Sequence, residues 1–226
     1  MIIATPKPVN ELMNHLAGCS SVLVLGCQTC VSIGRSGGKA SIESTILALE
    51  MGFKQKNHVI KFILESSLRQ CESEFLELAF GSVDIEYDAI LSFGCAAGVQ
   101  TVAATHPSKR VIPALNTRFM GAPETDSSWE IRCVGCGDCF LHETGGICVL
   151  SRCPRSMQNM SCGFESESGR CDVNPRLECV WDIIRSRWKN MRTIKARNWS
   201  LAAGGGITRL HRPCLSELDF LETSDE

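Results

Sequence analysis

The sequence predicts an α/β protein: an open parallel-sheet, Rossmann-like domain over residues 1–120, followed by a small cysteine-rich metal or iron–sulfur module. Short runs of β-branched residues and leucine alternate with helical patterns in the first half of the chain, which is typical of a parallel sheet with helical crossovers. Eight of the 14 cysteines lie between Cys133 and Cys179. With 226 residues, of which 44% are hydrophobic, the chain is long enough for a core domain and a small second module.

The elements of the first domain follow from their periodicity. Ser21 to Gly26 is a continuous run of valine and leucine, as in a strand that is buried on both faces. Ile42, Ile46 and Leu49 recur at spacings of a helix face. The same reasoning predicts strands at 21–26, 58–64, 87–93 and 110–115, and helices at 9–17, 41–50, 72–80 and 96–104.

The apolar periodicity fades after Thr117, and Gly121–Ser128 has the composition of a linker. The cysteine-rich module then occupies residues 129–180, where glycine and proline are frequent and apolar runs are short. Residues 181–226 are predicted to hold an amphipathic helix and an irregular tail. The helix spans 179–191, and its apolar face is expected to pack on the chain's own core through Trp181, Ile184, Trp188 and Met191.

Charge and composition exclude several classes of function. A net charge of −2 and an aromatic content of 6% give no general reason to bind nucleic acid or an acidic membrane. No apolar run approaches the ~20 residues of a membrane span, and the amino terminus lacks the order of a signal peptide. We therefore expect a cytoplasmic protein. Six basic residues near the carboxy terminus are predicted to form the solvent-exposed face of an amphipathic helix and not a nucleic-acid site: Arg185, Arg187, Lys189, Arg192, Lys195 and Arg197.

A glycine-rich segment at Gly34–Ser41 superficially resembles a phosphate-binding loop. The Walker pattern needs four residues between its glycines and a hydroxyl residue directly after the lysine, but here three residues separate Gly34 from Gly38, and Ala40 follows Lys39. No G-x-G-x-x-G fingerprint follows the first strand either. The sequence therefore predicts neither a Walker-type nucleotide site nor a dinucleotide site.

A first candidate site lies in the α/β domain. Thiols in a reducing compartment are more economically explained as metal ligands than as disulfides. Strand carboxyl ends of a parallel sheet form a common crevice, so residues far apart in sequence converge there. Four cysteines fall at such ends and are predicted to share an iron–sulfur cluster or a zinc ion: Cys27, Cys30, Cys71 and Cys95. The alternative is that they are ordinary buried cysteines, as we expect for Cys19 and Cys214.

A second candidate site lies in the cysteine-rich module. Cys133-x2-Cys136-x2-Cys139 resembles the start of a ferredoxin cluster motif, although the fourth ligand is not at ferredoxin spacing. The remaining cysteines bring the total to eight, enough for two four-ligand centres: Cys148, Cys153, Cys162, Cys171 and Cys179. Zinc is the alternative metal, and His142 is either a zinc ligand or a solvent-facing loop residue.

Short motifs spread along most of the chain share a resemblance. They are Leu25-Gly-Cys-Gln-Thr-Cys30, Arg69-Gln-Cys71, Gly94-Cys-Ala-Ala-Gly-Val-Gln100, Pro113-Ala-Leu-Asn-Thr117, Cys136-Gly-Asp-Cys139, Thr144-Gly-Gly-Ile-Cys148, Arg152-Cys-Pro154 and Gly169-Arg-Cys-Asp-Val173. Together they resemble the small cysteine-rich MetV-type subunit of bacterial methylenetetrahydrofolate reductases. The chain departs from the family pattern at Gly34, where a third cysteine is often found, and at Phe164, where a glycine is expected.

The resemblance implies a non-catalytic subunit that carries iron–sulfur clusters of the [4Fe–4S] type, with zinc as a further metal. Its partner would be a flavin-containing methylenetetrahydrofolate reductase subunit, with FMN or FAD bound on that partner only. Electrons would come from a low-potential donor protein and serve one-carbon, tetrahydrofolate metabolism. The alternative is a zinc-stabilised structural adaptor with no redox role. We expect no catalytic residue in this chain, which shows no convincing acid/base pair.

Overall fold

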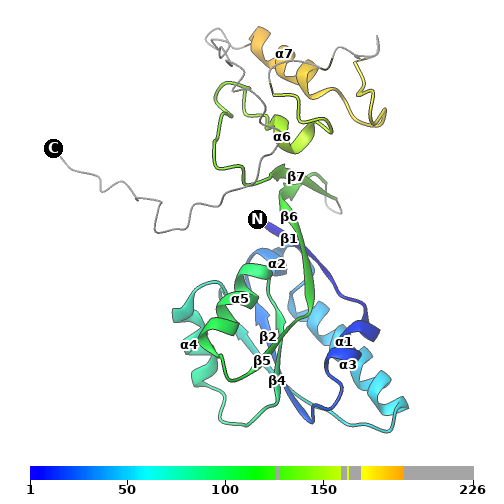
Figure 1. The fold of residues 1–226 in the computed structure, drawn as a ribbon, viewed down its shortest axis with the longest axis vertical. Coiled ribbons are helices and arrows are strands. Elements are labelled where there is room, and N and C mark those ends of the chain that lie inside the picture. The colour runs from blue at the N-terminus through cyan, green and yellow to red at the C-terminus, as the bar shows by residue number, and fades with distance from the viewer. Residues whose placement is uncertain (126–127, 159–161, 163–168, 191–226) are drawn as a thin grey trace, which may run out of the picture. The chain divides into compact units, whose positions relative to one another are not determined.

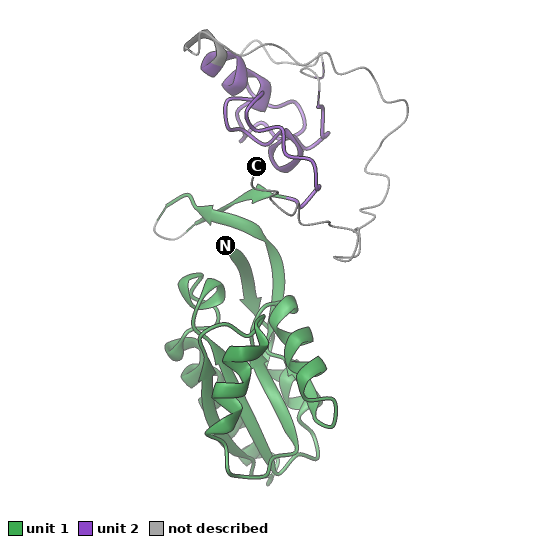
Figure 2. Cartoon of the chain, turned by 90° about the vertical axis from the view of Figure 1, so that its left-hand side faces the viewer, with its two compact units in different colours: residues 1–133 green, residues 134–226 purple. Residues whose placement is uncertain are grey.

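The computed structural model describes residues 1–125, 128–158, 162 and 169–190, and it gives no side-chain description for 188–190. The chain forms two compact units, residues 1–133 and 134–226 (Figure 2). Within the described ranges, no helix combines the length and the apolar character that crossing a bilayer requires.

The first unit is built on a four-stranded parallel sheet (Figure 1). Its strands are β2 (Ser21–Cys27), β3 (Lys61–Ser67), β4 (Ala89–Phe93) and β5 (Arg110–Pro113), in the order β3-β2-β4-β5. All three pairings are parallel, and β2 pairs on both sides, with Leu23 opposite Ile63 and Ile90. The predicted α/β class with a parallel sheet is confirmed.

Helices cover both faces of the sheet (Figure 1). Val22 and Val24 pack into the core cluster that includes residues of α1 (Val9–His15) and α3 (Lys39–Gln55). Leu23 and Leu25, on the opposite face of β2, pack into the cluster that includes residues of α4 (Ser73–Gly81) and α5 (Ala96–Thr105). Because the two central strands β2 and β4 bury both faces, their sequences are mostly apolar runs without alternation.

The order of the strands creates a crevice at the carboxyl ends of the sheet strands. The chain leaves β2 for β3 on one side, and it then returns past β2 to form β4 on the other side. At such a switch point the connections after the two central strands diverge, and they leave an opening outside the carboxyl ends. The short helix α2 (Cys30–Ile33) and the start of α5 border this opening of the first unit.

Most predicted elements match the observed bounds to within one or two residues at each end, and two differ by more. The second strand was predicted at 58–64, but β3 spans Lys61–Ser67, because an edge strand tolerates the polar side chains of Glu65 and Ser66. The predicted helix 41–50 is part of the longer α3, Lys39–Gln55.

A three-stranded antiparallel sheet was not predicted. It consists of β1 (Ile2–Pro6), β6 (Leu115–Pro123) and β7 (Trp129–Cys133), in the order β1-β6-β7. The interpretation of Gly121–Ser128 as a linker is wrong for its first three residues, since β6 continues to Pro123 and Gly121 pairs with Ile131. The short strand β1 is stabilised by β6, more than a hundred residues later, so local sequence carries little sign of it.

The second unit has a small core of its own. Besides α6 (Val149–Arg152) and α7 (Val180–Asn190), its described part is mostly loops. The core consists of Phe140, Ile147, Val149, Val180, Trp181 and Ile184. The burial of Trp181 and Ile184 confirms the predicted inward face of α7 for these two residues. The side chain of Trp188, together with Met191, Arg192, Lys195 and Arg197, lies outside the described residues.

A buried amide joins three segments of the first unit at the crevice. Gln70, which is fully buried, donates from Nε2 to the Leu25 carbonyl of β2 at 2.8 Å. Its Oε1 accepts a hydrogen bond from Ser92 Oγ of β4 at 2.6 Å, and Ser92 Oγ accepts one from Gly94 N at 3.2 Å. A Cβ on Gly94 would come within 2.3 Å of Gln70 Oε1, so the close approach requires glycine. Gln70 thus fixes the loops that carry the residues after these strands.

Replacing this amide tests the junction. Gln70→Leu would leave the Leu25 carbonyl and the Ser92 hydroxyl without their buried partner, and each unpaired group costs about 1–3 kcal/mol. We expect the free energy of unfolding to fall by at least about 2 kcal/mol in urea denaturation. The matched control is Gln100→Leu, because Gln100 is exposed on α5 and bonds only within its own helix at Ala96 O. Equal denaturation midpoints for the two variants would contradict the account.

Candidate functional site

Four cysteines border the crevice of the first unit, and we call them the crevice thiols: Cys27, Cys30, Cys71 and Cys95. Cys27 is the last residue of β2 and Cys30 the first of α2. Cys71 directly follows Gln70 between β3 and α4, and Cys95 is the N-cap of α5. All four are free thiols, and Cys71 is the exposed one among them.

Electrostatic coupling links the crevice thiols to one another. The pKa of Cys71 is raised, first by loss of water around its thiol and then by the negative charges that Cys95 and Cys27 carry as thiolates. The pKa of Arg69 is raised, first by its hydrogen bond to Glu72 and also by the charges of Cys71 and Cys30. Thiols from three separate loops therefore share one electrostatic environment. Their role as ligands stays a prediction.

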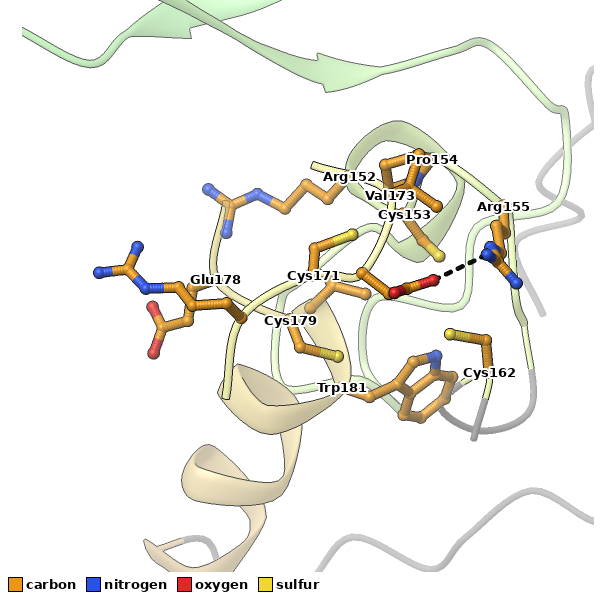
Figure 3. A pocket seen from close by; sticks show the side chains of 13 residues that line it. Arg152, Cys153, Pro154, Arg155, Cys162, Cys171, Val173, Glu178, Cys179 and Trp181 are labelled. Carbon is orange, nitrogen blue, oxygen red and sulfur yellow. Dashed lines mark hydrogen bonds and ion pairs between the residues drawn. The ribbon is translucent and has the colours of Figure 1, made fainter. Parts of the chain in front are cut away.

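The second unit contains a cavity with four cysteines on its wall, which we call the four-thiol cavity. It has about 420 Å³ of empty space, part of which is open solvent, and Cys153, Cys162, Cys171 and Cys179 line it. In Figure 3 the four sulfur atoms turn toward the same space. All four cysteines are partly buried, free thiols. Consecutive cysteines of this group are eight or nine positions apart in the sequence, a spacing that gives no sign that they form one group.

A tight hairpin positions two of the four thiols. Arg170 and Glu178 form an isolated antiparallel bridge. Cys171 N donates to Leu177 O at 2.9 Å, and Cys179 N donates to Gly169 O at 3.0 Å. Gly169 has a φ of +72°, a left-handed conformation that glycine adopts without strain. The hairpin thus carries Cys171 and Cys179 on its two arms.

A third thiol is held at the end of a helix turn. Cys153 is the C-cap of α6, and its Sγ accepts a hydrogen bond from Met157 N at 3.5 Å. Backbone N–H donors to sulfur are among the contacts that tune iron–sulfur centres. Met157 O in turn accepts a hydrogen bond from the indole Nε1 of buried Trp181 at 2.8 Å. Trp181 therefore ties the Cys153 loop to α7 and to the core of the unit.

Charged side chains surround the four-thiol cavity. Arg152, Arg155 and Arg170 line it together with Asp172 and Glu178, so the arginines outnumber the carboxylates on the wall by one. Arg155 pairs with Asp172 at 3.0 Å, which joins the segment after Cys153 to the segment after Cys171. Because both partners are about half exposed, this ion pair contributes little stability by itself.

The remaining predicted ligands do not line this cavity. Cys133, Cys136 and Cys139 are exposed, and Cys136 Sγ donates to Asp138 O at 3.3 Å. Cys148 is the N-cap of α6. His142 is 76% exposed and lies 3.5 Å from a Glu143 oxygen, in keeping with a solvent-facing residue. Cys214 and Phe164 lie outside the described residues. Among the residues that are described, no three His, Cys, Asp or Glu side chains are placed to hold one metal ion.

Comparison with known proteins bears on the second unit. Residues 112–201 match a family model described as the C terminal of methylene-tetrahydrofolate reductase. The match links this part of the chain to that reductase. It contains the four-thiol cavity, but it excludes β2, β3 and β4 and with them the crevice thiols. No curated protein matches the chain. The search of solved structures found no match either.

The coupling between crevice thiols can be measured in the metal-free protein. A raised pKa means less thiolate at a given pH, so alkylation of Cys71 by iodoacetamide should have its pH midpoint above the ~8.5 of a free cysteine. Cys95→Ser removes one neighbouring negative charge and should lower that midpoint. Cys19→Ala is the control, because Cys19 lies before the opposite end of β2. Peptide mass spectrometry gives the rates, and identical midpoints in wild type and Cys95→Ser would contradict the coupling.

Proposed function

We propose that the chain is an iron–sulfur subunit or domain that works with a flavin-containing methylenetetrahydrofolate reductase. The observation that carries the proposal is the group of four thiols around one cavity in the segment that matches the reductase family model. Four cysteine thiolates are the usual ligand set of a [4Fe–4S] cluster. Free thiols that border a common space, on a wall where arginines outnumber carboxylates by one, fit that chemistry.

We propose a cluster ahead of zinc at this cavity. A structural zinc ion holds four ligands, each sulfur at about 2.3 Å, so its cysteines converge on one point. Four cysteines line this cavity, and in Figure 3 their sulfurs turn toward one space. In a [4Fe–4S] cluster each thiolate binds a different iron, so the sulfurs stand around a volume.

The chain's own residues hold and orient the ligands. The 170–178 bridge sets the separation of Cys171 and Cys179, and Trp181 anchors the loop after Cys153. When bound, a [4Fe–4S] cluster would supply one-electron transfer. The buried indole and the apolar core beside it would limit the access of water to the site.

A second centre is proposed at the crevice thiols. Their convergence at the switch point and the coupling of Cys71 to Cys95 and Cys27 support it. Cys30 completes a set of four, as Gly34 supplies no side chain. Cys133, Cys136 and Cys139, with Cys148, stay a sequence-based proposal for a further iron–sulfur or zinc site.

The partner in this proposal is a methylenetetrahydrofolate reductase. The flavin and the folate chemistry would belong to the reductase, and a low-potential protein would donate electrons to this chain. The link to the reductase rests on the family match.

Cysteine variants test the ligand set. After anaerobic reconstitution with iron and sulfide, Cys171→Ser should bind about four fewer iron atoms per chain than wild type, the content of one [4Fe–4S] cluster. It should also lose the matching EPR signal of the reduced protein. Cys19→Ala should keep both, because Cys19 is a buried core residue that does not line the four-thiol cavity. Equal iron content in Cys171→Ser and wild type would rule out this cavity as the cluster site.

Electron delivery separates the redox role from that of an adaptor. A purified methylenetetrahydrofolate reductase is mixed with wild type or Cys171→Ser, and the rate of flavin reduction by an artificial low-potential donor is followed by absorbance. We expect both chains to bind the reductase and only wild type to accelerate flavin reduction. Equal acceleration by wild type and Cys171→Ser would indicate the zinc-stabilised adaptor instead.

A further inference from the structure

A second cavity lies in the first unit, at the carboxyl ends of β2 and β3 and beside the first turn of α3. It has about 890 Å³ of empty space, part of which is open solvent. Val24, Ile42 and Leu64 give it an apolar wall, and polar side chains converge on the remainder. Ligand pockets commonly combine an apolar wall with a few converging polar groups, and in open α/β sheets they lie outside the strand carboxyl ends. We call it the α3 cavity.

The start of α3 gives one side of the α3 cavity a positive character. Gly37, Gly38 and Lys39 line the cavity, and Gly38 is the N-cap of the helix without a side-chain cap. The first hydrogen bond of the helix is from Ile42 N to Gly38 O, and the N–H groups of Lys39 and Ala40 have no partner among the described residues. Free N–H groups and the helix dipole favour an anion. The Lys39 ammonium adds a positive charge at the rim, where it is 88% exposed and lies 3.8 Å from a Glu43 oxygen.

A carboxylate lines the same cavity from β3. Glu65 Oε1 accepts a hydrogen bond from Ser66 N at 2.8 Å, and Oε2 accepts one from Ser82 Oγ at 2.7 Å. These bonds fix the carboxylate, and each oxygen keeps a further lone pair for a hydroxyl donor. A bare anion would be repelled by Glu65. A ligand that suits both sides therefore carries an anionic group at one end and hydroxyl groups at the other.

We propose that the α3 cavity binds a sugar phosphate, either free or as the ribose phosphate of a mononucleotide. The phosphate would lie at the start of α3 with Lys39, and the sugar hydroxyls would donate to Glu65. Gln28, whose Nε2 donates to Ser66 Oγ at 2.8 Å, adds a further polar group to the wall. A single lysine and a single helix start suit one phosphate, which agrees with the missing Walker and dinucleotide patterns. Cys27, one of the crevice thiols, also lines the α3 cavity, so the two proposed sites share a wall, but no group that would bind the sugar phosphate is a proposed metal ligand.

Calorimetric titration of the full chain tests the proposal with ribose 5-phosphate, AMP and inorganic phosphate. We expect ribose 5-phosphate to bind more tightly than phosphate, because only the sugar reaches Glu65. If AMP binds more tightly than ribose 5-phosphate, the cavity is assigned to a mononucleotide. If AMP and ribose 5-phosphate bind equally, it is assigned to a free sugar phosphate. The absence of heat with all three probes at millimolar concentration would overturn the proposal, whether or not the chain carries iron.

Three variants locate the binding. Lys39→Ala should weaken ribose 5-phosphate about tenfold, the effect of losing one charged hydrogen bond. Glu65→Gln should weaken ribose 5-phosphate but not phosphate. Lys54→Ala is the matched control, because it removes an exposed lysine from the last turn of the same helix. Unchanged affinity in both cavity variants, with thermal melting as in wild type, would place any binding elsewhere and overturn the proposal.

Discussion

The second unit has few apolar side chains with which to hold its loops together, and the rest of its structure depends on this constraint. Six residues form the core of its described part. A small core supplies little stability, and natural modules of this size often use metal bonds or disulfides as well. The described thiols are free, and under the proposed function the bonds of a bound cluster would add to this small core. Ordering of the loops that carry Cys153, Cys171 and Cys179 and binding of a cluster would then be one thermodynamic event.

The first unit differs in that its sheet has a large core and buried hydrogen bonds hold the loops of its crevice. Gln70 joins β2 and β4 through buried hydrogen bonds and so places Cys71 beside the loops that hold Cys27 and Cys95. Gln70 belongs to the Arg69-Gln-Cys71 motif, but the sequence gives no sign that its amide would be a buried hydrogen-bonding junction. Gly94 and Gly98 do not have a positive φ. They are required to be glycine because a Cβ at either position would clash with Gln70.

The sequence predicted the parallel sheet and its helices because burial on both faces leaves continuous apolar runs and clear helical periodicity. It did not predict β1, β6 and β7, which are short and pair across long sequence distances. From topology alone it predicted that four cysteines follow the strand carboxyl ends, where the structure places them, and their role as ligands stays a prediction. In the cysteine-rich module the two-residue spacings pointed to Cys133, Cys136 and Cys139. The four-thiol cavity instead depends on the hairpin that carries Cys171 and Cys179 and on the Trp181 contact near Cys153. Spacing along the chain does not encode such loop geometry.

X-ray absorption at the iron and zinc edges tests the central claim most directly. The chain is purified without oxygen and compared with a variant in which Cys153, Cys162, Cys171 and Cys179 are all changed to serine. The account predicts that wild type contains iron bound by sulfur with iron neighbours, and that the component lost in the variant is of this kind. A lost component made of isolated zinc bound by four sulfurs, or no lost component at all, would contradict it.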